Sequence, residues 1–166
     1  RYSELICEKL ITIAEDGSFQ LDMSYFDYAT GLTMTNKKFH DLFGGPPRAA
    51  EAELTQREMD LSASIQKVTE YIVSRLAKNI ARETGERNLC LAGGVALNCV
   101  ANGILLRERI FDNIWIQPAA GDAGGALGAA LSIWHLHYNK KRKISVDRDS
   151  MKGAYLGPEF SNDEIE

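Results

Sequence analysis

Two glycine-containing segments of this 166-residue chain hold residue types that could bind a ligand. In the first, Gly93 and Gly94 separate an apolar run from a helical pattern, and Asn98 follows one turn later. Glycine lets a backbone approach a ligand closely, and the N–H groups of a first helical turn attract phosphate. Asn98 could hydrogen-bond a ribose or a phosphate. The spacing is neither the dinucleotide fingerprint nor a phosphate-binding loop, so a plain strand-to-helix turn explains it about as well.

The second segment places Asp122 before a helical pattern made almost wholly of glycine and alanine. Gly124, Gly125 and Gly128 each cost a helix roughly 1 kcal/mol relative to alanine. We therefore expect a close backbone approach here, to another helix or to a ligand. Asp122 could cap the helix, or it could be the carboxylate of a metal or phosphate site, and its spacing alone favours the cap.

The remaining polar candidates carry weaker signals. His135 and His137 are two residues apart and face different sides of a helix, so they should not share one metal ion. His40 has no evident partner in the sequence, and Arg48 follows two prolines in what should be a solvated loop. The basic run 140–143 is typical of a solvated face.

Composition limits the classes of partner. Apolar residues make up 45% of the chain and charged residues 25%, which is typical of a folded globular protein. A net charge of −4 gives no indication of a nucleic-acid partner, and no apolar run approaches the roughly 18 residues of a membrane span. Cys7, Cys90 and Cys99 lack the spacing of a zinc site, and we expect Cys90 and Cys99 to fill core space. With no leader-like start, the sequence predicts a cytoplasmic protein.

Alternating strand and helix patterns should position the two glycine segments. An apolar run at 88–92 predicts a buried strand, and 95–106 has a helical pattern. A second unit repeats this order, with a strand at 113–116 and a helix from Asp122 to about His137. Such alternation predicts an α/β layer with parallel strands.

The first part of the chain has a different character. Apolar runs at 10–14 and 19–21 flank Asp16-Gly17, a dipeptide that suits the turn of a β-hairpin. Aromatic residues follow, and residues 35–43 predict a short helix that ends at the Gly-Gly-Pro-Pro sequence 44–47.

A long amphipathic helix should begin near Thr55 and end at Gly85. We divide the chain into an inserted hairpin and aromatic subdomain (1–54), a nucleotide-binding α/β lobe (55–138) and a linker (139–166). Apolar residues recur at helical spacing along this helix: Leu61, Ile65, Val68, Ile72, Leu76 and Ile80.

The two glycine segments together resemble a known family. NLCLAGGVALNCVANG (88–103) and IWIQPAAGDAGGALGAAL (114–131) closely resemble carbamoyltransferases of the nodulation protein U and antibiotic O-carbamoyltransferase type. Four further segments are similar in the same order: EDGSFQLDMSYFDY (15–28), LFGGPPR (42–48), DLSASIQ (60–66) and AYLGPEFSNDEI (154–165).

The resemblance implies the second lobe of an actin-like and sugar-kinase-like (ribonuclease H-like) domain. In that family, a YrdC-type domain makes carbamoyl-adenylate from carbamoyl phosphate and ATP, and the first domain transfers the carbamoyl group to a hydroxyl of a sugar or an antibiotic-type compound. The chain starts at Arg1 and stops where an acidic helix is beginning. We therefore expect a fragment, inactive alone, whose partners are the small-molecule acceptor, carbamoyl phosphate and the other lobes, with a homodimer possible.

By motif position, the resemblance implies that Gly93, Gly94 and Asn98 bind the nucleotide. It implies that Asp122 joins two upstream histidines around a divalent metal, usually iron, and so reverses the preference for a cap. His40, His135 and His137 do not have the spacing of that histidine motif, so the metal site should be incomplete here. No general base is evident in this segment.

Three other functions stay open. A sugar or acetate kinase would have a similar glycine turn. The tRNA threonylcarbamoyl enzymes usually continue the aspartate motif into Asn and Ala, whereas here Asp122 continues into Ala-Gly-Gly, which favours the small-molecule branch. A non-catalytic module could bind an adenine nucleotide, or could only dimerise through the aromatic subdomain.

Overall fold

A computed structural model describes residues 1–143 and 151–166 as a mixed α/β fold, which confirms the predicted class at that level. The chain forms two compact units. Unit 1 comprises Arg1–Arg87 and Gly103–Phe111, and unit 2 comprises Asn88–Asn102 and Asp112–Glu166. Each unit holds one two-stranded sheet. Residues 144–150 of the predicted linker lie outside the described residues.

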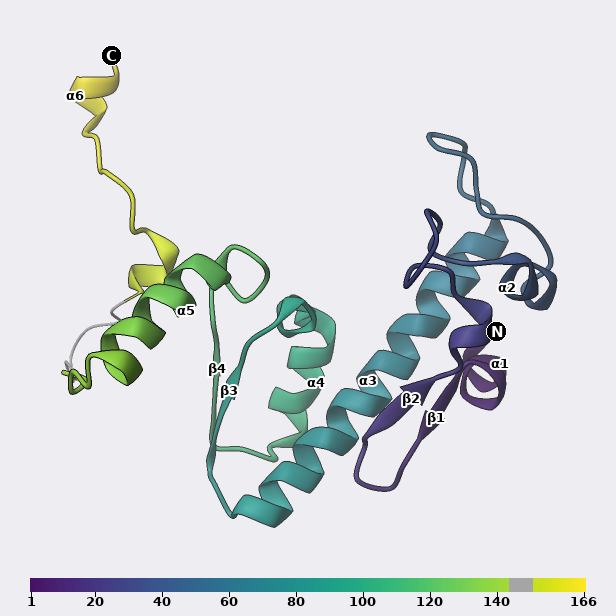
Figure 1. The fold of residues 1–166 in the computed structure, drawn as a ribbon, viewed down its shortest axis with the longest axis horizontal. Helices are drawn as coiled ribbons and strands as arrows, with labels where there is room; N and C mark the ends of the chain where they lie inside the picture. The colour runs from purple at the N-terminus through teal and green to yellow at the C-terminus, as the bar shows by residue number, and fades with distance from the viewer. Residues whose placement is uncertain (144–150) are drawn as a thin grey trace. The chain divides into compact units, whose positions relative to one another are not determined.

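A short helix and a hairpin open unit 1 (Figure 1). Helix α1 (Ser3–Lys9) leads into strand β1 (Ile11–Ile13), which pairs antiparallel with β2 (Phe19–Leu21). Gly17 in the turn has a φ of 90°, a conformation that favours glycine, and the Asp16 carboxylate accepts the N–H two residues ahead at 2.9 Å. The predicted hairpin is confirmed.

Helix α3 (Gln56–Thr84) is the long helix of unit 1. The Thr55 side chain and the Glu58 carboxylate form a capping box at its start, with Glu58 accepting the Thr55 N–H at 3.0 Å. Gly85 ends it in the left-handed conformation at a φ of 66°. Both predicted ends are confirmed, because each depends on local chemistry that the sequence shows.

The aromatic segment contributes a 3₁₀ turn, η1 (Met23–Tyr25), and helix α2 (Lys37–Leu42). Asn36 caps α2 by accepting the Lys38 N–H at 3.0 Å. The chain leaves this helix through Gly44, which has a φ of 81°. The short helix predicted before the Gly-Gly-Pro-Pro sequence is therefore confirmed.

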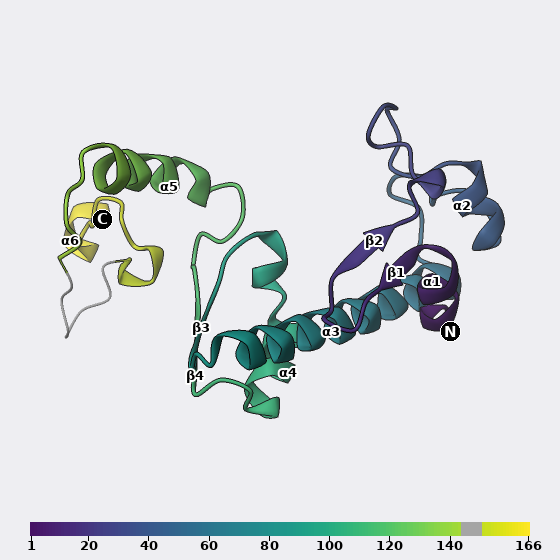
Figure 2. The same cartoon turned by 60° about the horizontal axis from the view of Figure 1, so that its bottom comes forward.

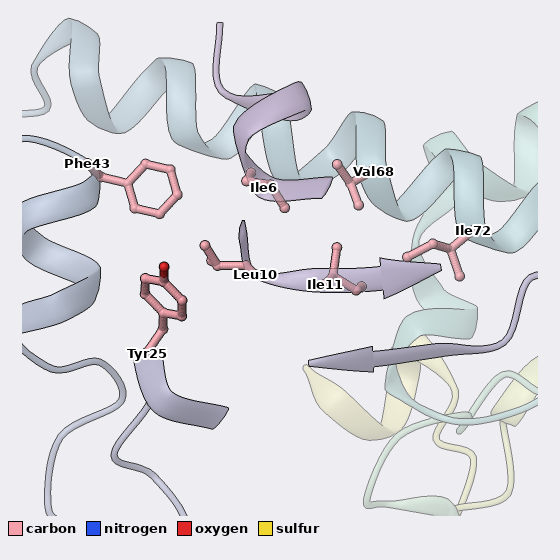
Figure 3. Packing of buried hydrophobic residues seen from close by; sticks show 7 residues of the cluster. All are labelled: Ile6, Leu10, Ile11, Tyr25, Phe43, Val68 and Ile72. Carbon is pink, nitrogen blue, oxygen red and sulfur yellow. The ribbon is translucent and has the colours of Figure 1, made fainter. Parts of the chain in front are cut away.

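The core of unit 1 lies where α1 and the hairpin pack on α3, as Figures 2 and 3 show. Val68 and Ile72 from α3 are buried there, whereas Ile65 and Ile80 are 52% and 41% exposed. Leu61 and Leu76 are partly buried and also pack against this core, so the predicted apolar stripe is confirmed except at Ile65 and Ile80. The buried members of this cluster are Ile6, Leu10, Ile11, Tyr25, Phe43, Val68 and Ile72.

The end of helix α4 (Cys99–Glu108) is tied to α3 within unit 1. The buried Ser74 hydroxyl donates to one Glu108 oxygen at 2.6 Å, and the Lys78 ammonium donates to the other at 2.9 Å. Lys78 also donates to the Ser74 hydroxyl at 2.9 Å. These bonds lower the pKa of Glu108, the Ser74 hydroxyl being the largest cause.

Unit 2 contains the predicted parallel pair of strands. Strand β3 (Asn88–Leu91) pairs with β4 (Asn113–Ile116), and Leu89 lies opposite Ile114. A 3₁₀ turn, η2 (Gly94–Leu97), follows β3 and precedes α4. The helical pattern predicted at 95–106 is therefore broken in two at Asn98, whose ψ of 90° is extended.

After β4 come helix α5 (Gly124–Ser132) and a π-helical turn, η3 (Ile133–His137). The described C-terminal residues hold η4 (Lys152–Ala154) and α6 (Asn162–Ile165). A Ser161–Glu164 capping box starts α6 and confirms the expected acidic helix start. Among residues 1–143 and 151–166, no helix combines the length and the apolar character that crossing a membrane requires.

Two predictions of burial in unit 2 are wrong. Strand β3 alternates between exposed and half-buried residues instead of being buried. Cys90 and Cys99 are exposed and do not fill a core. Parallel sheets are normally covered on both faces, but within unit 2 this two-stranded sheet leaves Trp115, opposite Cys90, 45% exposed.

Candidate functional site

The two glycine segments meet at the carboxyl ends of the parallel strands in unit 2. The Gly93 N–H donates to the Ala120 carbonyl at 2.8 Å, and the Gln117 N–H donates to the Leu91 carbonyl at 3.0 Å. Strands β3 and β4 are neighbours in Figure 1, and these two bonds extend their pairing into the loops that follow them. Ligands of open parallel sheets bind outside the carboxyl ends of strands, so this is the edge at which a ligand is expected.

The glycine turn is open on the side that a Cβ atom would occupy. Gly93 has a φ of 97°, which favours glycine, and no atom in the described part of the chain lies within 4 Å of a Cβ built there or at Gly94. The Ala96 N–H is bonded to the Gly93 carbonyl at 3.0 Å. Within the described residues, the N–H groups of Gly94 and Val95 have no backbone acceptor, so this turn offers two donors to an anion.

Asn98 and Asn102 connect the glycine turn to helix α4. The Asn98 carbonyl oxygen Oδ1 accepts the Ala101 N–H at 3.1 Å and so caps the helix. The Asn102 side chain donates to the Ala96 carbonyl at 2.7 Å and fixes the turn from the other side. Sequence reasoning did not identify Asn102, because an asparagine one turn into a helical pattern gives no signal of this contact.

Asp122 lies in the loop that joins β4 to α5, and its side chain is exposed. Helix α5 begins at Gly124 with Ala123 as its N-cap residue, and the Gly125 N–H bonds to the main-chain carbonyl of Asp122 at 3.1 Å. The carboxylate makes no hydrogen bond to another described residue. The interpretation of Asp122 as a side-chain cap is therefore wrong, and its carboxylate is available at the carboxyl edge of the sheet.

Steric contact explains why one of the helix positions, 124, is occupied by glycine. A Cβ atom at Gly124 would lie 2.2 Å from the Ala119 carbonyl oxygen, so the loop and the helix start pack too closely for a larger residue. The expected close approach is therefore found at Gly124, but it is made within the loop itself. Gly125 and Gly128 have no atom within 4 Å of a built Cβ, and the described residues give no reason for them.

The side chains present do not fit a metal ion. Across the described ranges, no three His, Cys, Asp or Glu side chains come together as a ligand set. His135 Nδ1 lies 2.6 Å from the Lys140 carbonyl oxygen, and His40 Nε2 lies 3.1 Å from the Thr35 hydroxyl in unit 1. One carboxylate, Asp122, is too few ligands for a stable divalent site.

Comparison with known proteins gives a consistent match. The family model described as "Carbamoyltransferase N-terminus" matches residues 1–131. A protein of Synechocystis sp. (strain ATCC 27184 / PCC 6803 / Kazusa), described as uncharacterized, is 63% identical over 166 residues, which is 100% of this chain and 27% of that protein.

Two named relatives come from Bradyrhizobium diazoefficiens. Nodulation protein NolO is 43% identical over 110 residues, covering 66% of this chain and 19% of NolO. Nodulation protein U is 36% identical over 95 residues, covering 55% of this chain and 16% of that protein. The chain thus spans about a quarter or less of the length of each of these relatives.

Proposed function

The chain belongs to the carbamoyltransferase family, by its match to the N-terminal part of that family, and we propose that it supplies the nucleotide-facing half-site of an O-carbamoyltransferase. The reaction is the transfer of a carbamoyl group from carbamoyl phosphate, through a carbamoyl-adenylate, to a hydroxyl of a sugar or antibiotic-type compound. The fold we propose for the whole domain is an actin-like and sugar-kinase-like lobe, of which β3 and β4 are two strands.

The meeting of the glycine turn with the Asp122 loop is the observation that carries this proposal. The 2.8 Å bond from Gly93 to Ala120 holds both segments at the edge where a nucleotide would bind. The Gly94 and Val95 N–H groups would then hold the adenylate phosphate, which is the leaving group when the carbamoyl carbon is attacked. Asn98, bonded to the start of α4, would position the turn rather than reach the phosphate with its Oδ1 atom.

Asp122 would be one ligand of a metal completed by residues outside this chain. The described residues supply no second and third ligand beside Asp122. Among the described residues, no side chain is hydrogen-bonded to the Asp122 carboxylate, so none is positioned there as a general base. We therefore propose that the chain alone transfers no carbamoyl group, and turnover of carbamoyl phosphate with any hydroxyl acceptor by this chain would refute this.

Isothermal titration of the chain with ATP and AMP, with and without ferrous iron, tests the proposed nucleotide site. We expect Gly94→Asp to weaken binding at least about tenfold, because the new carboxylate would face the phosphate. Iron should leave the nucleotide affinity unchanged, since a lone Asp122 should not retain it.

Gly157→Asp is the matched control. No atom of the described residues lies within 4 Å of a Cβ built at Gly94 or Gly157, so neither substitution should disturb folding. The control should bind nucleotide as the unmodified chain does. Equal binding by the unmodified chain and Gly94→Asp would place the nucleotide elsewhere and refute the role of the turn. Binding followed by phosphate transfer to a sugar would favour a kinase instead.

A further inference from the structure

Unit 1 carries a cavity of about 440 Å³ that is widely open to solvent and that none of the preceding functions uses. Its walls come from three elements, namely α1, the end of β1 and the middle of α3. A volume in this range is typical of sites for small organic molecules. The side chains that matter here are Glu4, Cys7, Ile13, Lys67, Val68 and Tyr71.

Two opposite charges line this cavity without neutralising each other. Glu4 lies on α1 and Lys67 on α3, and both side chains are exposed. Within the described ranges, neither forms an ion pair with any residue, whereas some other charged side chains of unit 1 do, such as Lys37 with Asp41 at 2.7 Å. Ile13 and Val68 also line the cavity and are apolar.

The cavity walls are held in place by contacts that do not involve Glu4 or Lys67. The Tyr2 N–H donates to the buried Ser64 hydroxyl at 3.0 Å, which fixes the start of α1 against α3. The guanidinium of Arg75 lies 5.3 Å from the centre of the Tyr71 ring and also donates to the Tyr71 hydroxyl. Walls that are already ordered reduce the entropy that a ligand must overcome.

We propose that this cavity binds a small zwitterion with a short apolar side chain, of the size and chemistry of a free amino acid. The ligand ammonium group would pair with Glu4, its carboxylate with Lys67, and its side chain would lie on Ile13 and Val68. A singly charged ligand would leave one of the two charges without a partner. This inference does not depend on the proposed carbamoyl transfer.

The test is an NMR titration of the full 166-residue chain with L-leucine, isoamylamine and isocaproate. The last two are leucine without its carboxylate and leucine without its ammonium group. We expect leucine to shift the amide signals of α1 and of residues 67–71 with a dissociation constant on the order of 1 mM, which is reasonable for so small a ligand. Each analogue should bind about fivefold more weakly, because it loses one partly exposed ion pair.

Cys7 gives an independent readout because it lines the cavity and is a free, exposed cysteine. Leucine should slow the alkylation of Cys7 by iodoacetamide and leave the rates of Cys90 and Cys99 unchanged. Those two thiols are exposed and lie in unit 2, so they serve as internal controls.

Paired substitutions distinguish charge recognition from a general effect on folding. Glu4→Gln and Lys67→Met should each weaken leucine binding about fivefold. The double variant Glu4→Lys/Lys67→Glu, in which the two charges are exchanged, should restore leucine binding. The ammonium and carboxylate groups of leucine would then exchange their places in the cavity. Lys37→Met on α2 is the control and should leave binding unchanged. The proposal is overturned if leucine binds no better than both analogues, if Lys67→Met has no effect, or if Cys7 is not protected.

Discussion

Gly17 at the tip of the hairpin should be among the glycines of unit 1 that least tolerate replacement. A Cβ atom there would lie 2.6 Å from the Leu76 main-chain nitrogen and 3.0 Å from the main chain of Arg75. Both neighbours belong to the continuous helix α3, so they cannot move aside as a flexible side chain would. Gly17→Ala must therefore push the hairpin off α3.

The expected loss of stability has two parts. The φ of 90° at Gly17 costs an alanine about 1–2 kcal/mol. Displacement of the hairpin adds packing strain of about 1–3 kcal/mol and weakens the 2.8 Å bond from Arg75 to the Glu15 carbonyl, worth about 1 kcal/mol. We expect a total loss of about 3–6 kcal/mol in the free energy of unfolding.

Gly44→Ala provides the matched control. Its φ of 81° is similar, but no atom lies within 4 Å of a built Cβ, so only the backbone term of about 1–2 kcal/mol applies. Urea unfolding gives the free energy of unfolding of both variants. Amide hydrogen exchange in α1 and α3 shows how much of each loss falls on unit 1. If Gly17→Ala and Gly44→Ala lose equal stability, the contact with α3 contributes nothing and the reasoning is refuted.

Three further outcomes follow from the capping, core and buried polar contacts. Phe43→Ala should destabilise unit 1 by about 3–5 kcal/mol in urea unfolding, since its ring is 3% exposed and lies 4.6 Å from the ring of Phe39. Thr55→Ala should cost about 1 kcal/mol by removing the cap of α3, and an unchanged unfolding midpoint would contradict this. Hydrogen bonding, chiefly from the Thr55 hydroxyl, lowers the pKa of Glu58 from 4.5 to about 2. Its contribution to stability should be fully present above pH 4.5 and lost as the pH falls toward 2. Thr55→Ala should weaken this dependence without abolishing it, because Arg57 and the main-chain N–H of residue 55 still donate to Glu58. Ser74→Ala should raise the pKa of Glu108 toward its ordinary value in a carbon-detected NMR titration, whereas no change would show that the Ser74 hydroxyl does not hold that carboxylate.

Features set by neighbouring residues could be predicted from the sequence. The Asp16-Gly17 turn, the Thr55 cap and the Gly85 stop are local signals, and the structure has all three. Parallel pairing of β3 with β4 was also predictable, because strand and helix patterns alternate there. For these elements, the preferences of a few adjacent residues decide the conformation.

Features set by distant contacts could not be predicted in the same way. An apolar run cannot show how many elements will cover it, so the burial expected for Cys90 was wrong. The contact of Gly124 with the Ala119 carbonyl depends on how tightly the loop folds back. In the candidate site, the glycine turn was predicted from its residue types, but its bond to Ala120 depends on a strand that begins some twenty residues later in the chain.

The shared helix α4 has a consequence for the order in which the chain can fold during synthesis. Unit 1 includes Gly103–Phe111, so it is completed only after β3 and the glycine turn of unit 2 have already been made. Until Glu108 leaves the ribosome, Ser74 and Lys78 lack the carboxylate that they bind in the finished structure. Unit 1 therefore cannot finish folding before the synthesis of unit 2 has begun. Because each unit is made of two separate stretches of the chain, no single cut can release either unit whole.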